Sequence, residues 1–179
     1  KVIFDGEQMG PTTEGPKMYK YEGWYYILMP SGGVATGWQS ALRSKQVWGP
    51  YEYKIVMHQG NTEVNGPHQG GWVTGVDGRH WFVHFQDVIE LGRITHLQPM
   101  CFNEGWPFIG SEQNGDGIGE PVKEWHLPAE GQPCYEIAQS DDFKGEKLGL
   151  QWQWQANPKE VYYSLKGDGG LRLNCLSND

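Results

Sequence analysis

The sequence predicts an all-β protein, and three observations carry this prediction. Short runs rich in Tyr, Trp, Val and Ile alternate with turn residues along the whole chain. Glycine accounts for 26 of the 179 residues, and it gathers at the corners between these runs. No segment of ten or more residues repeats its apolar side chains every 3.6 positions, as an amphipathic helix would. Strands joined by tight turns are therefore the expected elements.

The first part of the chain contains four predicted strands. The first two flank Glu22-Gly23, a two-residue connection typical of a β-hairpin. The last two are separated by the turn-forming sequence Trp48-Gly49-Pro50. The four predicted strands are residues 17–21, 24–29, 35–43 and 51–57.

A second set of four predicted strands resembles the first. Asn65-Gly66-Pro67 precedes it, 51 positions after Glu14-Gly15-Pro16 precedes the first set. A repeat of four short strands over roughly 40–50 residues is typical of a β-propeller blade. The alternative is a coincidental pair of hairpins. The strands of the second set are residues 71–74, 80–86, 92–102 and 107–109.

The remainder of the chain has a different texture. A stretch rich in Gly, Glu and Pro predicts a linker. Beyond it, residues 151–155 alternate Gln and Trp, which is typical of a half-buried antiparallel strand, and residues 161–165 and 170–174 are further predicted strands. Propellers close with about four to eight blades, so we expect parts of two domains. These are the last propeller blades at 1–110, a linker at 111–135 and the start of a β-sandwich at 136–179.

Charge and composition exclude several classes of function. The formal net charge is −8 and Lys and Arg are not clustered, which disfavours a nucleic-acid partner. The sequence contains no run of 18 apolar residues, which a membrane span would need, and no apolar leader follows Lys1. Cys101, Cys134 and Cys175 are widely spaced and odd in number, so they predict free thiols rather than a disulfide framework or a zinc ribbon. The compartment stays open between secreted, periplasmic and cytoplasmic.

Polar residues with possible chemical roles lie where predicted strands begin. Glu14 precedes the first strand of the first set, and His68 follows Gly66-Pro67 in the second set, at the position equivalent to Lys17. If both sets are blades, the two side chains face one central channel. The alternatives are a solvated turn carboxylate and a structural histidine. Arg93 lies in a mostly apolar strand and needs an acceptor if it points inward.

Three aromatic residues are candidates for carbohydrate binding. Trp38, Trp72 and Phe85 could each offer a flat face on which a sugar ring stacks.

Several motifs follow one another along the chain in a specific order and spacing. They are Glu14-Gly15-Pro16-Lys17, Trp24-Tyr25-Tyr26, Asn65-Gly66-Pro67-His68-Gln69-Gly70-Gly71, Trp81-Phe82-Val83-His84-Phe85-Gln86-Asp87, Leu91-Gly92-Arg93, Gln98-Pro99, Gly105-Trp106-Pro107 and Leu148-Gly149-Leu150-Gln151-Trp152. Taken together, the motifs of residues 14–107 resemble glycoside hydrolase family 43 in order and spacing. Residues 141–154 resemble the concanavalin-like β-sandwich that follows the propeller in many β-xylosidases of that family.

The resemblance implies a five-bladed propeller with inverting β-xylosidase or α-L-arabinofuranosidase activity. Glu14 matches the general acid, whose pKa has to be raised by burial and by a neighbouring negative charge. His68 matches a histidine at the propeller centre that in many members helps to hold a calcium ion (Ca2+) or its water shell. Arg93 matches an arginine that reaches the sugar.

The chain departs from the family pattern in its carboxylates. Members also use an Asp base and a second Asp that tunes the acid, and Asp5, Asp77 and Asp87 match neither position. We expect both residues in blades that precede Lys1, so the chain alone is expected to be inactive. The expected partners are those missing N-terminal blades and a xylo- or arabino-oligosaccharide from plant cell walls. The alternative function is a non-catalytic, lectin-like propeller that binds carbohydrate.

Overall fold

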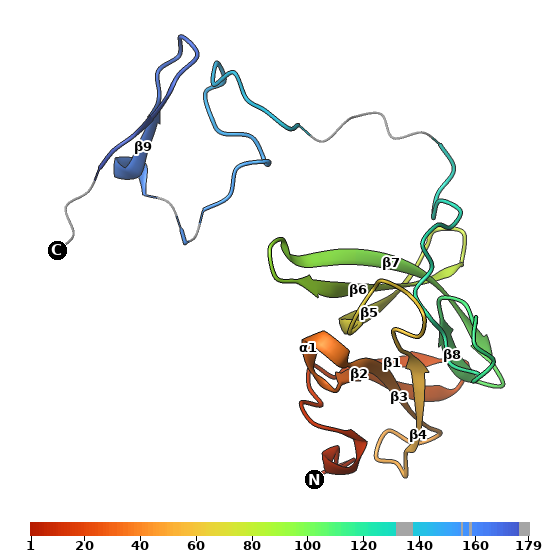
Figure 1. The fold of residues 1–179 in the computed structure, drawn as a ribbon. Helices are drawn as coiled ribbons and strands as arrows, with labels where there is room; N and C mark the ends of the chain where they lie inside the picture. Colours follow the sequence, from red (N-terminus) through yellow and green to blue (C-terminus); the bar gives the residue numbers. More distant parts are fainter. Residues whose placement is uncertain (132–137, 155, 158, 176–179) are drawn as a thin grey trace. The chain divides into compact units, whose positions relative to one another are not determined.

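The computed structural model describes residues 1–131, 138–154, 156–157 and 159–175, and it divides into two compact units, Lys1–Glu130 and Gly131–Asp179. Almost all of the regular structure is β-strand, so the prediction of an all-β chain is confirmed (Figure 1). Within the described ranges, none of the helices has the length and apolar character needed to cross a membrane.

The first sheet of the first unit is an antiparallel meander in which each strand pairs with the next along the chain. The turn at Glu22-Gly23 has positive φ at both residues, as the tightest two-residue hairpins require. A β-bulge between Gln39 and Ser40 shifts the register of the last pair. The strands are β1 (Lys17–Tyr21), β2 (Trp24–Ser31), β3 (Trp38–Ser44) and β4 (Glu52–Met57).

The second sheet has the same order and the same antiparallel pairing. A positive-φ turn at Glu104-Gly105 joins its last two strands. A second bulge lies between His68 and Gly71, at the start of the sheet's first strand. The strands are β5 (His68–Thr74), β6 (His80–Val88), β7 (Gly92–Asn103) and β8 (Trp106–Ile109).

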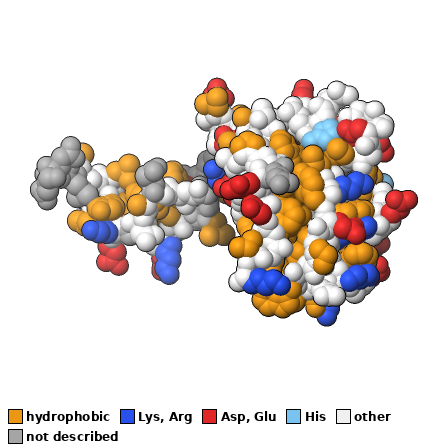
Figure 2. Space-filling view, turned by 90° about the horizontal axis from the view of Figure 1, so that it is seen from below, with side chains coloured by type: hydrophobic (Ala, Val, Ile, Leu, Met, Phe, Trp, Pro, Cys, Tyr) orange, Lys and Arg blue, Asp and Glu red, His pale blue; other side chains and the backbone are white. Residues whose placement is uncertain are grey.

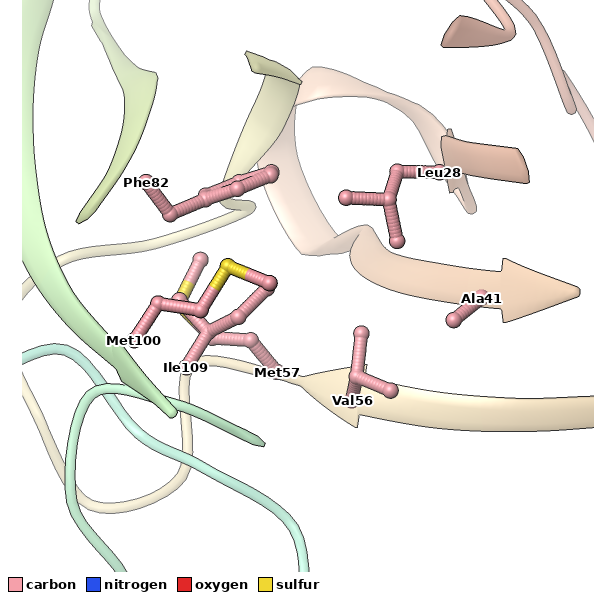
Figure 3. Close-up of a cluster of buried hydrophobic side chains, with 7 residues drawn as sticks. All are labelled: Leu28, Ala41, Val56, Met57, Phe82, Met100 and Ile109. Atoms are coloured by element: carbon pink, nitrogen blue, oxygen red, sulfur yellow. The ribbon is translucent and has the colours of Figure 1, made fainter. Parts of the chain in front are cut away.

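The two sheets pack face to face, and their inner faces form the main core of the unit. Figure 3 shows side chains from both sheets pointing toward one another, with Leu28 and Ala41 on one side and Phe82 on the other. Aromatic side chains extend this core, with Tyr19, Trp72 and others packed against it. The buried residues of this main core are Leu28, Ala41, Val56, Met57, Phe82, Met100 and Ile109.

The other face of the first sheet is covered by the N-terminal segment. This segment contains the short 3-10 helix η1 (Glu7–Met9). Met9 is buried against Ile27 and Leu42, and Ile3 and Phe4 pack on the same cluster. Elsewhere on this unit, Figure 2 shows a band of hydrophobic side chains between charged groups on the face that it presents.

The second unit contains little regular structure in its described residues. The 3-10 helix η2 (Glu160–Tyr162) leads into β9 (Tyr163–Leu165), which pairs antiparallel with β10 (Leu171–Leu173). Two aromatic pairs hold its chain together: Phe143 with Trp152, and Trp154 with Tyr163, with ring centroids 5.3 and 4.9 Å apart.

The ends of several strands differ from the prediction by one to three residues, and three predicted strands contain residues with another structure or do not form. Residues 35–36 belong to the one-turn helix α1 (Gly33–Thr36), because Gly32 and Gly33 turn the chain with φ of +86° and +80°. Residues 151–154 form no strand, since no described segment pairs with them, and Gln155 lies outside the described residues. In the predicted strand 161–165, the 3-10 turn takes the first two residues.

The cysteines follow the prediction as far as the structure describes them. Cys101 and Cys175 are exposed free thiols. Cys134 lies outside the described residues.

Candidate active site

Glu14 lies where the chain enters β1, and the backbone holds it there. Its N–H donates a hydrogen bond to the carbonyl of Pro30, at 3.2 Å. Gly15 follows with φ of +54°, a left-handed conformation that glycine adopts without steric cost. The Glu14 side chain is 52% exposed, so the carboxylate is reachable from solvent.

His68 meets Glu14 from the beginning of β5, although 54 residues separate them in the chain. Its ring is 1% exposed, and Nε2 lies 3.1 Å from Oε1 of Glu14. Because a carboxylate only accepts hydrogen bonds, Nε2 is the ring nitrogen that donates. The side-chain amide of Gln39 binds the carbonyl of Pro67 at 3.0 Å and so fixes the turn that places His68.

Gln69 is a second donor to Glu14, and the sequence interpretation missed it. Its Nε2 donates to Oε1 of Glu14 at 2.9 Å. Gln69 lies within the β5 bulge and has φ of +50°, which is uncommon for a residue other than glycine. The available signal was its position among the glycines of His68-Gln69-Gly70-Gly71, which predict an irregular strand start.

The electrostatics of Glu14 differ from the expectation for a general acid. Hydrogen bonds from Gln69 and then from His68 hold the pKa of the Glu14 carboxyl below its usual value. Burial opposes this effect, while the charge of Arg93 lowers the pKa further. No carboxylate in the described part of the chain contributes a rise. The expected upward shift is therefore absent here, because the described surroundings are donors and a cation.

Arg93 and Phe85 complete a cluster around Glu14 and His68. Cζ of Arg93 lies 4.6 Å from the centroid of the Phe85 ring, a cation–π contact. The Phe85 ring in turn lies 6.0 Å from the ring of His68. Arg93 is exposed and its charge acts on Glu14. The structure thus brings together four of the six residues that the sequence suggested.

The two tryptophans have different surroundings. The Trp38 indole lies so close to Gly10 and Gly32 that a Cβ at either glycine would come within 2.9 Å of it. Trp72 packs in an aromatic cluster with Tyr19, Tyr21 and Phe102, and its indole N–H donates to His80 at 3.2 Å. The contacts of Trp72 are those of a packing residue between the sheets rather than of a neighbour of Glu14.

The described residues do not by themselves form a calcium site. Ca2+ takes six to eight oxygen ligands. Within the described ranges, no group of three or more His, Cys, Asp or Glu side chains lies close enough to hold a metal ion. Nε2 of His68 is engaged by Glu14, and Nδ1 is buried without a partner among the described residues. One nitrogen does not match the donor set of calcium.

Glu14 borders a cavity of about 230 Å³ whose other walls are mainly apolar. Its lining includes Ile3, Phe4, Pro16, Ile27, Met29 and Leu42. A larger cavity of about 600 Å³ has none of the candidate site residues in its walls. It lies by Tyr21, His80, Phe108 and Trp125.

Two family models match the sequence. Residues 1–107 match glycosyl hydrolases family 43, and residues 140–178 match the beta xylosidase C-terminal concanavalin A-like domain. A putative beta-xylosidase of Xylanibacter ruminicola is 46% identical over 180 residues, which cover 100% of this chain and 34% of the relative. A non-reducing end alpha-L-arabinofuranosidase of Bacteroides ovatus is 32% identical over 192 residues, which cover 95% of this chain and 35% of the relative.

The same relationship holds in three dimensions. The crystal structure of a family 43 protein from Bacillus licheniformis superimposes with a TM-score of 0.78 and 27% identity, over 92% of this chain and 34% of that one. The chain spans about a third of the length of the curated relatives that it matches. The predicted fold, part of a five-bladed propeller followed by part of a concanavalin-like sandwich, is confirmed by these matches.

Proposed function

The chain belongs to glycosyl hydrolases family 43, and on that premise we propose that the whole protein is an inverting glycosidase to which this chain supplies the general acid. It releases terminal xylosyl or arabinosyl residues from plant cell-wall oligosaccharides. The observation that carries the proposal is the Glu14 carboxylate, half-exposed and held by two donors where β1 begins. The names of the relatives, a beta-xylosidase and an arabinofuranosidase, support the substrate class.

In the proposed reaction, Glu14 protonates the glycosidic oxygen as its bond to the anomeric carbon breaks. A water molecule attacks from the opposite face, and a carboxylate base about 6.5–9.5 Å from the acid takes its proton. The configuration at the anomeric carbon inverts in this single displacement. Both products leave neutral, and a proton passes from the base back to Glu14 through solvent.

Asp5, Asp77 and Asp87 are not suited to be the base. Asp5 caps the N–H of Glu7, and Asp77 pairs with Arg79 in a hairpin turn. Asp87 lies in β6, across the ladder from Arg93. We place the base, and the carboxylate that raises the pKa of Glu14, in the remainder of the whole protein. A carboxylate there would offset the lowering by Gln69 and His68.

Arg93, Phe85 and Trp38 are the proposed substrate contacts. Arg93 offers a guanidinium that donates to sugar hydroxyls, and the Phe85 ring contacts that guanidinium through the 4.6 Å cation–π interaction. Trp38 offers the edge or face of an indole at the start of β3. The calcium ion at the propeller centre stays a prediction for the whole protein, and no step above depends on it.

The remaining blades are the proposed partner of the second sheet. Its outer face carries the apolar side chains of Val73 and Leu97, which are 48% and 41% exposed. They alternate along their strands with Trp72, which packs against the core, and with the buried Gln98, and therefore point away from the first sheet. In the propeller, such a face packs against the next blade.

The experiment compares the whole protein with its Glu14→Gln variant on xylosides and arabinosides with poor and good leaving groups. We expect kcat for substrates with a poor leaving group to fall by about 10²- to 10⁴-fold. For a dinitrophenyl glycoside, kcat should fall much less, because dinitrophenolate departs without being protonated. Glu124→Gln, at an exposed position, is the matched control and should act like the natural protein. Unchanged activity of Glu14→Gln, or a product of retained configuration by NMR, would overturn the proposal.

The chain alone gives a second test. Without the base, it should not hydrolyse nitrophenyl xyloside or arabinoside. Turnover by this chain that Glu14→Gln abolishes would contradict the placement of the base outside it.

A further inference from the structure

We propose that Gln69 is a positioning residue that, with His68, engages one oxygen of Glu14 and leaves the other to carry the transferred proton. This inference rests on the proposed function and adds a residue to its acid. The nearest alternative is that Gln69 only stabilises the turn at the start of β5.

The two hydrogen bonds converge on the same atom. Nε2 of Gln69 lies 2.9 Å and Nε2 of His68 lies 3.1 Å from Oε1 of Glu14. No described residue donates to Oε2. An amide N–H cannot accept a proton, so a proton on Oε1 would face the Gln69 donor, and the His68 donor as well in the tautomer that carries its hydrogen on Nε2. In the acid form, the proton therefore resides on Oε2, the oxygen without a protein partner.

The backbone is shaped to deliver the Gln69 amide to Glu14. Gln69 has φ of +50° within a bulge, a conformation that re-aims a side chain at a strand start. A Cβ on Gly15 would lie 2.3 Å from Oε1 of Gln69. The glycine after Glu14 thus leaves the space that the amide occupies.

Gly70, the next residue of the bulge, lies directly against the main core. A Cβ on Gly70 would lie 1.9 Å from Cζ of Phe82, a residue of the main core. The bulge therefore cannot move toward the core, and Gln69 stays at the edge where Glu14 lies. Gln69, a residue with a strained backbone, thus contacts the proposed catalytic carboxylate of Glu14, and such strained residues are common at active sites.

The kinetic test uses the whole protein with Gln69→Ala and Gln69→Glu, and Gln59→Ala as matched control. Among the described residues, the Gln59 amide donates to the carbonyl of Thr62 and not to Glu14. We expect kcat for a poor leaving group to fall about 10- to 100-fold in both Gln69 variants, with little change in KM. The loss should shrink to a few-fold at most for a dinitrophenyl glycoside, because its departure needs no proton.

A spectroscopic test uses this chain and no substrate. In 15N NMR spectra, the side-chain amide signals of Gln69 should shift when Glu14 is changed to Ala, while those of Gln59 stay in place. An unmoved Gln69 signal would overturn the inference.

The kinetic outcomes separate the two proposals. An equal loss on both leaving groups, or none, would overturn the role of Gln69 while Glu14→Gln still impairs protonation. Failure of Glu14→Gln itself would overturn the proposed function instead.

Discussion

Cζ of Arg43 lies 4.1 Å from the centroid of the Trp106 ring, and this contact joins the two sheets of the first unit. Arg43 is in β3, whereas Trp106 opens β8, so the contact spans the two four-stranded repeats. Trp24 lies on the guanidinium as well, at 4.7 Å, and Nη1 donates to the carbonyl of Glu104 at 2.8 Å. The Arg43 guanidinium, which contacts two indole rings, therefore links the two sheets. Its ion pair with the exposed Glu52 lies at the surface.

Changing Arg43 should destabilise the unit through the loss of this link. We expect Arg43→Met to lower the free energy of unfolding by about 1–3 kcal/mol, since it removes the stacking and the bond to Glu104. Urea unfolding followed by tryptophan fluorescence measures the loss. Glu52→Gln removes the exposed ion pair alone and should cost less than about 1 kcal/mol. Equal losses would show that the ion pair, and not the indole contact, matters.

Gly70 and Gly71 make a matched pair in the same strand. A methyl group at Gly70 would lie 1.9 Å from the Phe82 ring, whereas at Gly71 its nearest neighbours are 3.8 Å away. Gly70→Ala should therefore cost about 1–3 kcal/mol or more through overpacking, and Gly71→Ala should change stability little. Thermal unfolding of both variants checks this, and a stable Gly70→Ala protein would contradict the packing argument.

Arg93 should depend on Phe85 for its position in the proposed site. Loss of the ring in Phe85→Leu removes a cation–π contact of about 0.5–2 kcal/mol. We expect KM of the whole protein for a xyloside to rise about 2- to 30-fold with that loss. Phe108→Leu, in β8, is the control and should leave KM unchanged. An unchanged KM in Phe85→Leu would separate Arg93 from substrate binding.

The strands could be predicted from sequence wherever the signals were local. The Glu22-Gly23 turn and the flanking apolar runs define β1 and β2 without knowledge of any distant residue. The Gln-Trp alternation at 151–154 failed because a strand also needs a neighbour, and no described segment pairs with it. An alternating pattern predicts which side chains would share a face of a strand. Whether the strand forms depends on hydrogen bonding to a neighbouring strand.

The candidate site was predictable to the same extent. Glu14 precedes the Gly-Pro pair of the first repeat and His68 follows that of the second, so the repeat itself predicted that both lie where a sheet begins, and the structure brings them into contact. Gln69 could not be foreseen, because its reach to Glu14 depends on a positive φ and on space left by Gly15. The lowered pKa of Glu14 was missed for the same reason, since the amide of Gln69 is its main cause.

His84 is a buried histidine that the fold holds in its neutral form. Its ring is 2% exposed and stacks on His96, with centroids 5.3 Å apart. Nδ1 donates to the carbonyl of Phe85, and Nε2 accepts from the amide of Gln98 at 3.3 Å. Protonation would add a hydrogen to Nε2, which would then face the N–H donor of Gln98 in a site that is closed to water. Burial accordingly lowers the pKa of His84 from 6.5 to about 4.

The stability of the first unit should therefore fall as the pH drops from about 6.5 to about 4. In that window the unfolded chain binds a proton at His84 that the folded chain excludes, so acid favours unfolding. The shift of His84 corresponds to about 3 kcal/mol of unfolding free energy, and His96, whose pKa burial also lowers, adds to it. Urea unfolding at several pH values should show a shallower slope in His84→Gln, which cannot titrate but keeps a donor and an acceptor. His126→Gln removes an exposed histidine and should leave the slope as it was; an unaltered slope in His84→Gln would mean that other groups govern the acid sensitivity.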